Sequence, residues 1–297
     1  MLTVKSIADM NAAIVANLHR IPRDVEAIVG IPRSGLLAAS AIALHMQKPL
    51  TDVEGLCDGR VYRRKLRKAS TVNRILLVDD TVLHGTAMNQ AVDLVRRARP
   101  KIRITRLAVY DSPVTPDGAV DLVCERVPGP RAFAWNLWKH TRLDRWCFDL
   151  DGVLCRDPRN DENDDGERYL QFVRSAALKF KPTQRIGYIV TARLEKYRAE
   201  TETWLQRHGI EHGGLYMLDL PTKAARMERG NRASFKAERY ATLTVKLRED
   251  GKQKPAELFV ESNNGQARKI NELTGKPVWC TDTQTFYPGA APLVSLD

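Results

Sequence analysis

Two pairs of carboxylates in this sequence are spaced for chemistry on phosphate or on a sugar. Asp79 and Asp80 are adjacent and follow the apolar residues 75–78, whereas Asp149 and Asp151 are spaced i, i+2 at the end of a second apolar run. Because side chains alternate along a strand, Asp149 and Asp151 can face one site, where one carboxylate attacks phosphorus and the other transfers protons. The adjacent pair suits binding of ribose hydroxyls or of a hydrated metal ion.

A glycine-containing loop follows the first acidic pair, and a similar loop precedes it. Residues 83–87 run through Gly85 into a helical pattern, and amides at such a helix start can hold a phosphate. Upstream, the loop from Gly30 to Gly35 joins a strand pattern to a helix pattern, and Arg33 places a cation within it. The upstream loop alone is equally well explained as a plain strand–helix turn. The two loops together predict a site for phosphoribosyl pyrophosphate (PRPP).

A basic segment at residues 59–68 carries six cations in ten positions. One interpretation is a solvated surface. A second is a mobile flap that closes over pyrophosphate and excludes water, with Arg63, Arg64, Lys65 and Lys68 as its candidate residues. A third is a patch at residues 60–68 that binds nucleic acid. The sequence leaves all three open.

The elements that must hold these groups alternate between strand and helix patterns. Strand patterns occur at residues 26–30, 75–80, 104–110, 119–124, 146–151, 186–191, 256–260 and 277–280, and helix patterns at residues 5–18, 36–46, 88–98, 195–208, 233–239 and 265–273. This alternation predicts an α/β fold, with mostly parallel sheets and helices on both faces. A length of 297 residues suggests about two domains, which we place at residues 1–140 and 141–297.

The composition argues against a membrane protein and shows a basic first half. The hydrophobic content is 43%, and no stretch approaches the roughly 20 apolar residues of a membrane span. The net charge of +11 comes mainly from residues 1–145, which hold 23 Lys and Arg against 14 Asp and Glu. Residues 146–297 hold 24 against 22. A basic field suits a polyanionic ligand, which is either a diphosphorylated sugar or nucleic acid.

Two further features concern the compartment. Residues 1–20 lack the charged start and the apolar run of a signal peptide. The five cysteines are scattered without a Cys-x-x-Cys pair, which is typical of free thiols in a reducing compartment. We therefore expect a cytoplasmic protein without a membrane partner.

The first half resembles the type I phosphoribosyltransferase family. The resemblance rests on the apolar strand, acidic pair and glycine loop at residues 75–88, and on the loop from Gly30 to Gly35. It implies that Asp79 and Asp80 hold the ribose hydroxyls and that Mg²⁺ bridges substrate oxygens. The residues that it assigns to the 5′-phosphate are Leu83, His84, Gly85, Thr86 and Ala87, and those that it assigns to the pyrophosphate are Gly30, Arg33 and Ser34.

Three positions depart from the pattern of that family. His84 and Ala87 stand where the family often has hydroxyl residues, so we expect the backbone amides and Thr86 to bind phosphate more weakly. Leu83 stands where purine-using members have an aspartate base, which argues against purine salvage of that kind. A proton-transfer group must then come from elsewhere, with Lys65 and Lys68 of the basic segment as the candidates, or the reaction needs no base.

The second half resembles the haloacid-dehalogenase (HAD) superfamily of phosphohydrolases, whose four sequence elements occur here in order. The resemblance implies that Asp149 is the nucleophile, that Asp151 is the general acid and base, and that Thr191 binds the phosphate. It also implies that Lys236 holds the phosphoaspartate, with Lys223 as an alternative.

The same resemblance implies a magnesium site. Its ligands would be Asp149, the Asp151 carbonyl, Glu261 and Asn263. The family more often has a second aspartate near Glu261, where this chain has Asn263 and Asn264. An acidic insert at residues 161–165 reads as a small lid or, with less support, as a calcium loop.

The order of the two halves resembles fused proteins of bacteria and their phages. We predict a bifunctional, Mg²⁺-dependent enzyme of nucleotide metabolism, which transfers ribose 5-phosphate from PRPP to a nitrogenous base and hydrolyses a phosphomonoester through an aspartyl-phosphate. Its partners would be small molecules (PRPP, a base or a nucleotide), and a homo-oligomer is left open. The alternatives are a nucleic-acid-associated defence effector or regulator that keeps the PRPP-binding fold, and a protein in which only the phosphatase is active.

Overall fold

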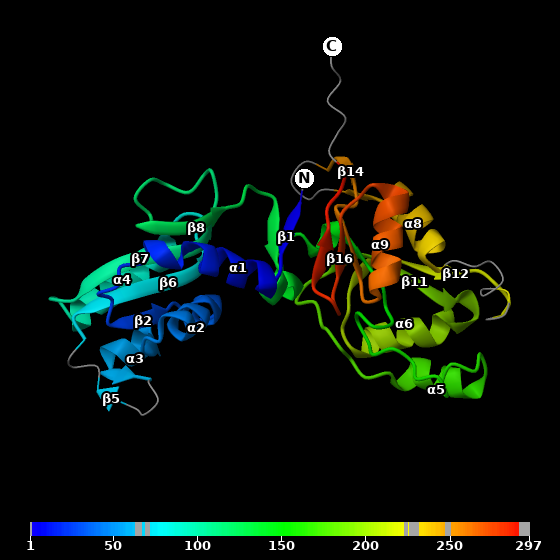
Figure 1. Cartoon of the computed structure of the whole chain (residues 1–297). Coiled ribbons are helices and arrows are strands. Elements are labelled where there is room, and N and C mark those ends of the chain that lie inside the picture. Colours follow the sequence, from blue (N-terminus) through cyan, green and yellow to red (C-terminus); the bar gives the residue numbers. More distant parts are fainter. Residues whose placement is uncertain are drawn as a thin grey trace, which may run out of the picture. The chain divides into compact units, whose positions relative to one another are not determined.

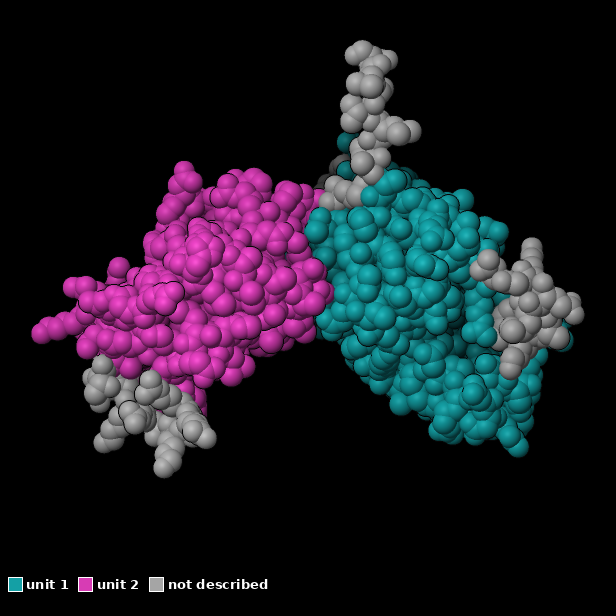
Figure 2. All heavy atoms as spheres, viewed as in Figure 1, with its two compact units in different colours: residues 1–4, 132–297 teal, residues 5–131 magenta. Residues whose placement is uncertain are grey.

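The chain folds into two compact units. The computed structural model describes residues 2–62, 67–68, 72–222, 225, 232–246 and 251–290. Residues 5–131 form the N-terminal unit, and residues 132–297 together with residues 1–4 form the C-terminal unit (Figure 1). Figure 2 shows the two units in different colours. The domain boundary between residues 140 and 141 stays a prediction.

The N-terminal unit is built on a five-stranded sheet in which every neighbouring pair is parallel. In spatial order the strands are β3 (Leu50–Asp52), β2 (Ala27–Gly30), β6 (Arg74–Thr81), β7 (Arg103–Asp111) and β8 (Leu122–Arg126). The chain passes from β2 to β3 on one side and then to β6 on the other side of β2. Such a reversal opens a crevice beyond the carboxyl ends of β2 and β6, where α/β sheets bind ligands.

Helices cover both faces of this sheet, as the continuous apolar runs of its strands predict. The helices are α1 (Ile7–Asn17), α2 (Ser34–Met46), α3 (Val53–Cys57) and α4 (Thr86–Ala98). Helix α2 packs on β2 and β6 and contacts α1, whereas α3 contacts α4 (Figure 1). The buried residues of α4 recur with helical spacing at Met88, Ala91, Val92 and Val95, so one side of the helix joins the core.

The C-terminal unit contains a six-stranded sheet. In spatial order its strands are β12 (His212–Leu218), β11 (Ile186–Leu194), β10 (Trp146–Phe148), β15 (Leu258–Glu261), β16 (Val278–Cys280) and β17 (Thr285–Tyr287). All neighbouring pairs are parallel except β16 and β17. The chain leaves β10 toward β11 and later returns to β15 on the other side. The reversal therefore falls between β10 and β15, and this is the second place where the topology favours a ligand site.

Two cores lie on opposite faces of this sheet, because adjacent residues of a strand point to opposite faces. Phe148 packs with residues of α5 (Glu167–Ser175) and α6 (Arg198–Arg207). Cys147 packs with residues of α8 (Arg232–Thr242) and α9 (Asn264–Thr274). Helices thus cover both faces, and the predicted two-domain α/β fold class is confirmed.

Shorter elements complete the described chain. The strands are β1 (Thr3–Lys5), β4 (Arg60–Val61), β5 (Arg67–Lys68), β9 (Arg131–Phe133), β13 (Thr244–Lys246) and β14 (Gln253–Pro255), and the 3₁₀ helices are Leu18–Arg20, Ala134–Lys139, Leu143–Arg145 and Glu195–Tyr197. The strand pairs β1–β9, β4–β5 and β13–β14 each form a two-stranded sheet. Within the described ranges, no helix combines the length and the apolar composition that crossing a membrane requires.

Some predicted boundaries differ from the observed ones for local reasons. The strand predicted at residues 119–124 is β8, and it begins only at Leu122 because a turn with Gly118 at φ +75° precedes it. The helix predicted at residues 195–208 starts as a 3₁₀ turn before α6. Strand β17 was not predicted, because Thr285–Tyr287 is short and only partly buried.

Candidate functional site

Asp149 and Asp151 lie where β10 ends and the chain turns. The Asp149 amide donates to the Val260 carbonyl at 2.9 Å, which continues the ladder between β10 and β15 by one residue. Gly152 then adopts φ +78°. A Cβ atom on Gly152 would lie 2.1 Å from Ser262 Oγ, so only glycine fits this turn. The turn directs both carboxylates to the carboxyl edge of the sheet.

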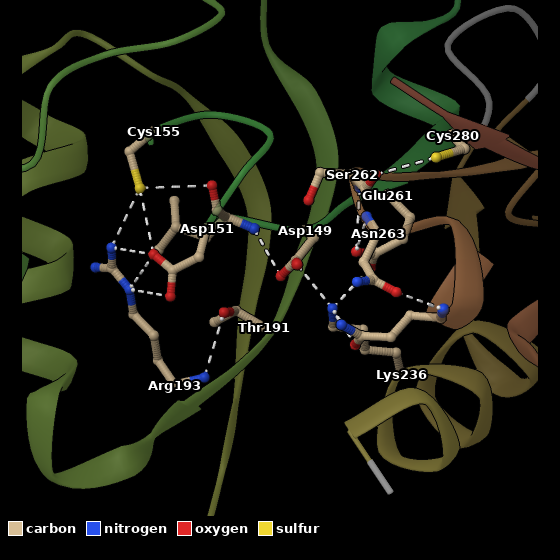
Figure 3. Close-up of polar contacts among 12 residues, drawn as sticks. Asp149, Asp151, Cys155, Thr191, Arg193, Lys236, Glu261, Ser262, Asn263 and Cys280 are labelled. Atoms are coloured by element: carbon tan, nitrogen blue, oxygen red, sulfur yellow. Dashed lines mark hydrogen bonds and ion pairs between the residues drawn. The ribbon is translucent and has the colours of Figure 1, made fainter. Parts of the chain in front are cut away.

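Lys236 joins the first of these carboxylates to Glu261 at the end of β15. Its Nζ atom donates to Asp149 Oδ2 and to Glu261 Oε2, both at 2.7 Å, and to Gln266 Oε1 at 3.0 Å (Figure 3). Lys236 is 1% exposed, Asp149 5% and Glu261 0%. A buried lysine therefore bridges two buried carboxylates that come from different strands.

Burial and charge shape the electrostatics of this cluster. Burial raises the pKa of Asp149 to about 7; Lys236 opposes this shift and Glu261 adds to it. Burial alone would lower the pKa of Lys236, but the Asp149 and Glu261 carboxylates outweigh it and raise that pKa. The ammonium of Lys236 therefore stays charged next to a carboxylate that titrates near neutrality.

Asp151 is held by a second buried cation, Arg193 of β11. Arg193 Nη2 donates to Asp151 Oδ1 at 2.6 Å, and Nε donates to both carboxylate oxygens at 3.1 and 3.3 Å (Figure 3). Tyr169 Oη donates to Asp151 Oδ2 at 3.4 Å, and Cys155 Sγ donates to Oδ1 at 3.3 Å. Asp149 and Asp151 thus each have their own cation.

These groups line one cavity of about 360 Å³. The structure brings together on its wall the predicted residues Asp149, Asp151, Thr191, Lys236, Glu261 and Asn263. Thr191 is 1% exposed and comes from β11, next to β10. The cavity wall also includes Tyr169, Arg193, Arg232 and Gln266, which are not among the residues predicted for the site. Arg193 alone carried a usable signal, because it is two residues from Thr191 on the same strand and faces the same side.

The predicted magnesium ligands have suitable donor chemistry, because Mg²⁺ prefers hard oxygen ligands. The side chains of Asp149, Glu261 and Asn263 are also engaged within the protein. Glu261 Oε1 accepts from the amides of Ser262 and Asn263 at 3.1 and 3.0 Å, and Asn263 Oδ1 caps α9 by accepting from the Gln266 amide at 3.0 Å. In the part of the chain that the structure describes, no three His, Cys, Asp or Glu residues are grouped as a metal site. The magnesium site therefore remains a prediction.

The acidic insert is largely neutralised by basic neighbours. Glu162 pairs with Arg156 at 2.6 Å and with Arg159 at 2.9 Å, and Asp165 pairs with Lys196 at 3.0 Å. Because these carboxylates pair with cations, and because no three described His, Cys, Asp or Glu residues form a group that could hold a metal ion, the structure does not support a calcium loop.

In the N-terminal unit, Asp79 and Asp80 are the last carboxylates of β6. Asp79 is 8% exposed and Asp80 4%, and the Asp80 amide donates to Asp79 Oδ1 at 2.9 Å. Burial and the neighbouring Asp80 raise the pKa of Asp79 to about 8. The pair lies at the predicted sheet edge, although inside the strand rather than after it.

Both predicted loops leave this edge of the sheet. Gly30 of β2 pairs with Val78 of β6, and β6 continues to Thr81, so the loop after β2 starts beside Asp79 and the loop after β6 starts at Val82. The peptide bond between Pro32 and Arg33 is cis, and Ser34 begins α2. In the other loop, Gly85 has φ +79° and precedes α4. Exposed residues here are Arg33, Leu83, His84, Thr86 and Ala87.

Arg131 supports the start of the loop after β6, and it belongs to none of the sequence motifs. Its Nη2 donates to Thr81 Oγ1 at 2.9 Å and to the Val82 carbonyl at 3.1 Å. Thr115 Oγ1 donates to the same carbonyl at 3.1 Å. No sequence signal links a residue 50 positions away to this loop.

Several candidates cannot be placed. Arg63, Arg64, Lys65 and Lys223 lie outside the described residues. Lys68 lies in β5, where it is paired with Arg60 of β4. The flap and its role in proton transfer therefore stay predictions.

Comparisons with known proteins give similarity in structure only. No protein-family model and no curated protein matches this sequence. Among solved structures, the xanthine-guanine-hypoxanthine phosphoribosyltransferase of Helicobacter pylori is 14% identical, with 46% of this chain and 93% of that chain covered and a TM-score of 0.38. The purine phosphoribosyltransferase of Pyrococcus horikoshii is 18% identical, with 45% and 93% covered and a TM-score of 0.34. The orotate phosphoribosyltransferase of Aeropyrum pernix is 18% identical, with 44% and 72% covered and a TM-score of 0.31.

Proposed function

We propose that the C-terminal unit is a phosphomonoesterase that works through an aspartyl-phosphate. The observation that carries this proposal is the contact of 2.7 Å between Lys236 Nζ and Asp149 Oδ2, in a cavity that also holds Asp151. A buried carboxylate beside a charged ammonium is suited to attack a phosphate whose negative charge would otherwise repel it. Thr191 on the same wall can donate its hydroxyl to a phosphate oxygen.

The reaction would proceed in two steps. In the first, Asp149 Oδ attacks phosphorus, the bond from phosphorus to the ester oxygen breaks, and Asp151 donates a proton to the leaving oxygen. In the second, Asp151 takes a proton from water while the water oxygen attacks phosphorus, and Asp149 leaves as a carboxylate. Lys236 offsets the charge of the phosphoaspartate in both steps.

Magnesium would support this chemistry from the oxygens of Asp149, Glu261 and Asn263 and from the Asp151 carbonyl. When bound, it would supply positive charge to the phosphate oxygens. Loss of turnover on chelation, and its return with added Mg²⁺, would test this part of the proposal.

We further propose that the N-terminal unit binds PRPP and transfers its ribose 5-phosphate to a nitrogenous base. Support comes from the position of Asp79 and Asp80 beside two loops at the switch point between β2 and β6. The two carboxylates would hold the ribose hydroxyls, and the loop through Gly85 would hold the 5′-phosphate on its amides. Gly30, Arg33 and Ser34 would line the pyrophosphate pocket, and Mg²⁺, when bound, would supply positive charge to the oxygens of the substrate.

The two activities would belong to nucleotide metabolism in one cytoplasmic protein. Phosphoribosyl transfer is reversible, so hydrolysis of its product would draw the transfer forward. Release of pyrophosphate from PRPP with a panel of bases tests the first activity, with an Asp79→Asn/Asp80→Asn variant as the control. Turnover of p-nitrophenyl phosphate tests the second, with Asp149→Asn as the control.

One observation favours the alternative hypothesis that only the phosphatase is active. Leu83 is 45% exposed at the position where a base would stand, so this loop offers no proton-transfer side chain there. This hypothesis would be supported if no base leads to release of pyrophosphate and if Asp80→Asn has normal phosphatase turnover. The nucleic-acid-associated alternative depends on residues 60–68, and salt-sensitive binding of DNA or RNA would test it.

A further inference from the structure

Arg193 is buried to an unusual degree for a charged side chain. Its side chain is 0% exposed, and it forms an ion pair with Asp151, whose side chain is 18% exposed. Removing a guanidinium from water is unfavourable, so it is tolerated only where partners compensate. Asp151 provides this compensation, and the pair outweighs burial to raise the pKa of Arg193.

The surroundings of Arg193 leave its guanidinium little freedom. Nη1 donates to Thr201 Oγ1 at 3.3 Å, and Nη2 also contacts Cys155 Sγ at 3.3 Å. The ring of Phe172 lies 5.5 Å from the guanidinium carbon. Contacts from α5, α6 and the turn after β10 therefore hold the plane of the guanidinium against the Asp151 carboxylate.

The two oxygens of Asp151 are held unequally. Oδ1 accepts the short contact of 2.6 Å from Arg193 and also accepts from Cys155 Sγ at 3.3 Å. From the described residues, Oδ2 accepts two longer contacts, 3.3 Å from Arg193 and 3.4 Å from Tyr169. Oδ1 is thus the anchored oxygen, and Oδ2 is the oxygen free to exchange a proton.

We propose that Arg193 is the positioning residue for Asp151, and that it presents Oδ2 of that carboxylate to the leaving oxygen of the substrate. This inference rests on the proposed phosphatase function. The planar fork of arginine is required, because two donors set the orientation of a carboxylate, whereas the ammonium of lysine supplies charge without orientation. Arg193 acts through Asp151 and takes no part in the attack by Asp149.

The proposal predicts a dependence on the leaving group. Proton donation matters most for an alkyl alcohol, which is a poor leaving group without a proton, and little for p-nitrophenolate, which leaves readily as an anion. If Asp151 is misplaced, the hydrolysis of alkyl phosphates should therefore slow more than the hydrolysis of p-nitrophenyl phosphate. Loss of general acid catalysis typically costs about 10²–10⁴-fold in rate.

The experiment compares Arg193→Lys with the wild-type full chain in the presence of Mg²⁺. We expect kcat to fall about 100-fold or more for an alkyl phosphate such as glycerol 2-phosphate, and less than about 10-fold for p-nitrophenyl phosphate. In an Asp151→Asn background, Arg193→Lys should add little further loss, because both changes remove the same function. Arg198→Lys, at an exposed ion pair on α6, is the matched control and should change neither rate.

A structural role alone would give a different result. Equal losses of kcat for both phosphates would overturn the inference while leaving the proposed function intact. So would a loss of kcat from Arg193→Lys that is as large in the Asp151→Asn background as in the otherwise wild-type protein. If the wild-type protein hydrolyses neither phosphate, the proposed function and this inference fail together. Should Arg193→Lys fail to fold in a thermal unfolding assay, Thr201→Val decides, because it removes the acceptor that lies 3.3 Å from Arg193 Nη1 and leaves Asp151 unchanged, so it must slow hydrolysis of the alkyl phosphate selectively.

Discussion

Gly35 packs directly against Asp79 in the N-terminal unit. A Cβ atom at Gly35 would lie 3.0 Å from Asp79 Oδ1 and 2.7 Å from the Val78 carbonyl oxygen. The second residue of α2 therefore touches the acidic pair of β6. The two sequence features that predicted a PRPP site are parts of one packed arrangement, and the glycine is required by this close approach rather than by a left-handed backbone.

Replacement of Gly35 by alanine should disturb this contact. The added methyl group meets a backbone carbonyl, which cannot move aside as a flexible side chain would, so we expect a loss of about 1–3 kcal/mol in the free energy of unfolding. Denaturant unfolding measures the loss, and PRPP binding should weaken in parallel. Gly129→Ala is the matched control, because a Cβ there meets nothing within 4 Å. Equal stability of the two variants would contradict the prediction.

The raised pKa of Asp79 makes the stability of the N-terminal unit depend on pH. The pKa of Asp79 rises from 3.8 to about 8 on folding, so between these values the folded state binds the proton and the unfolded state does not. Stability should therefore fall as the pH rises from about 4 to about 8. Asp79→Asn should be less sensitive to pH over this window and more stable than the wild type at pH 8.

Urea unfolding at pH 5 and pH 8 tests this expectation in each variant. Asp93→Asn changes an exposed carboxylate of α4 and serves as the control. A wild-type stability that stays constant or increases over the window, with no gain from Asp79→Asn, would show that the Asp79 carboxylate is not destabilised by burial.

Removal of the buried ammonium of Lys236 should destabilise the C-terminal unit. In Lys236→Met, Asp149 and Glu261 would face each other without the cation that lies 2.7 Å from each. Breaking one partner out of a buried ion network typically costs about 3–5 kcal/mol. We expect a loss of that order in denaturant unfolding, and loss of phosphatase turnover.

A second substitution should recover part of this stability without restoring activity. Lys236→Met/Glu261→Gln removes one of the two uncompensated charges, so it should be more stable than Lys236→Met alone. Lys269→Met, on the exposed side of α9, is the control and should have little effect. If the double variant is less stable than Lys236→Met, the idea that Lys236 compensates the charges of Asp149 and Glu261 is wrong.

Arg232 should bind a second anionic group on the substrate. Three cations line the cavity among the described residues, and two of them, Arg193 and Lys236, pair with carboxylates. Arg232 lies one turn before Lys236 on the same helix and has no ion pair or hydrogen bond with another described residue. Positions one turn apart are separated by about 6 Å, which suits two phosphate groups on one pentose.

Kinetics with Arg232→Gln test this expectation. KM should rise about 10-fold for a nucleoside 3′,5′-bisphosphate, because one ion pair at a partly exposed site is worth about 1 kcal/mol or slightly more. KM for p-nitrophenyl phosphate, which has no second anionic group, should be unchanged. Arg239→Gln, on the same helix but packed against Tyr216 and Phe235, is the matched control. The idea fails if both substrates respond equally to Arg232→Gln.

Much of each site was predictable because its residues stand at strand ends. A run of apolar residues marks a buried strand, and a polar residue at its end must lie at the edge of the sheet, as Asp79, Asp149 and Glu261 do. Lys236 was predictable as a helical residue, but its contact with Asp149 depends on α8 packing across the sheet. Local periodicity reports the element and its faces, and it does not report which elements are neighbours.

The α/β class, the acidic pairs and the strand ends on which they lie follow from local sequence patterns. The position of β10 between β11 and β15 does not, and it is this position that brings Arg193 to Asp151 and Glu261 to Lys236. The reason is physical, because strand order depends on packing between residues far apart in the chain, whereas periodicity and turn chemistry are local. The same distinction explains why Gly35 was visible as a loop glycine while its contact with Asp79 was not.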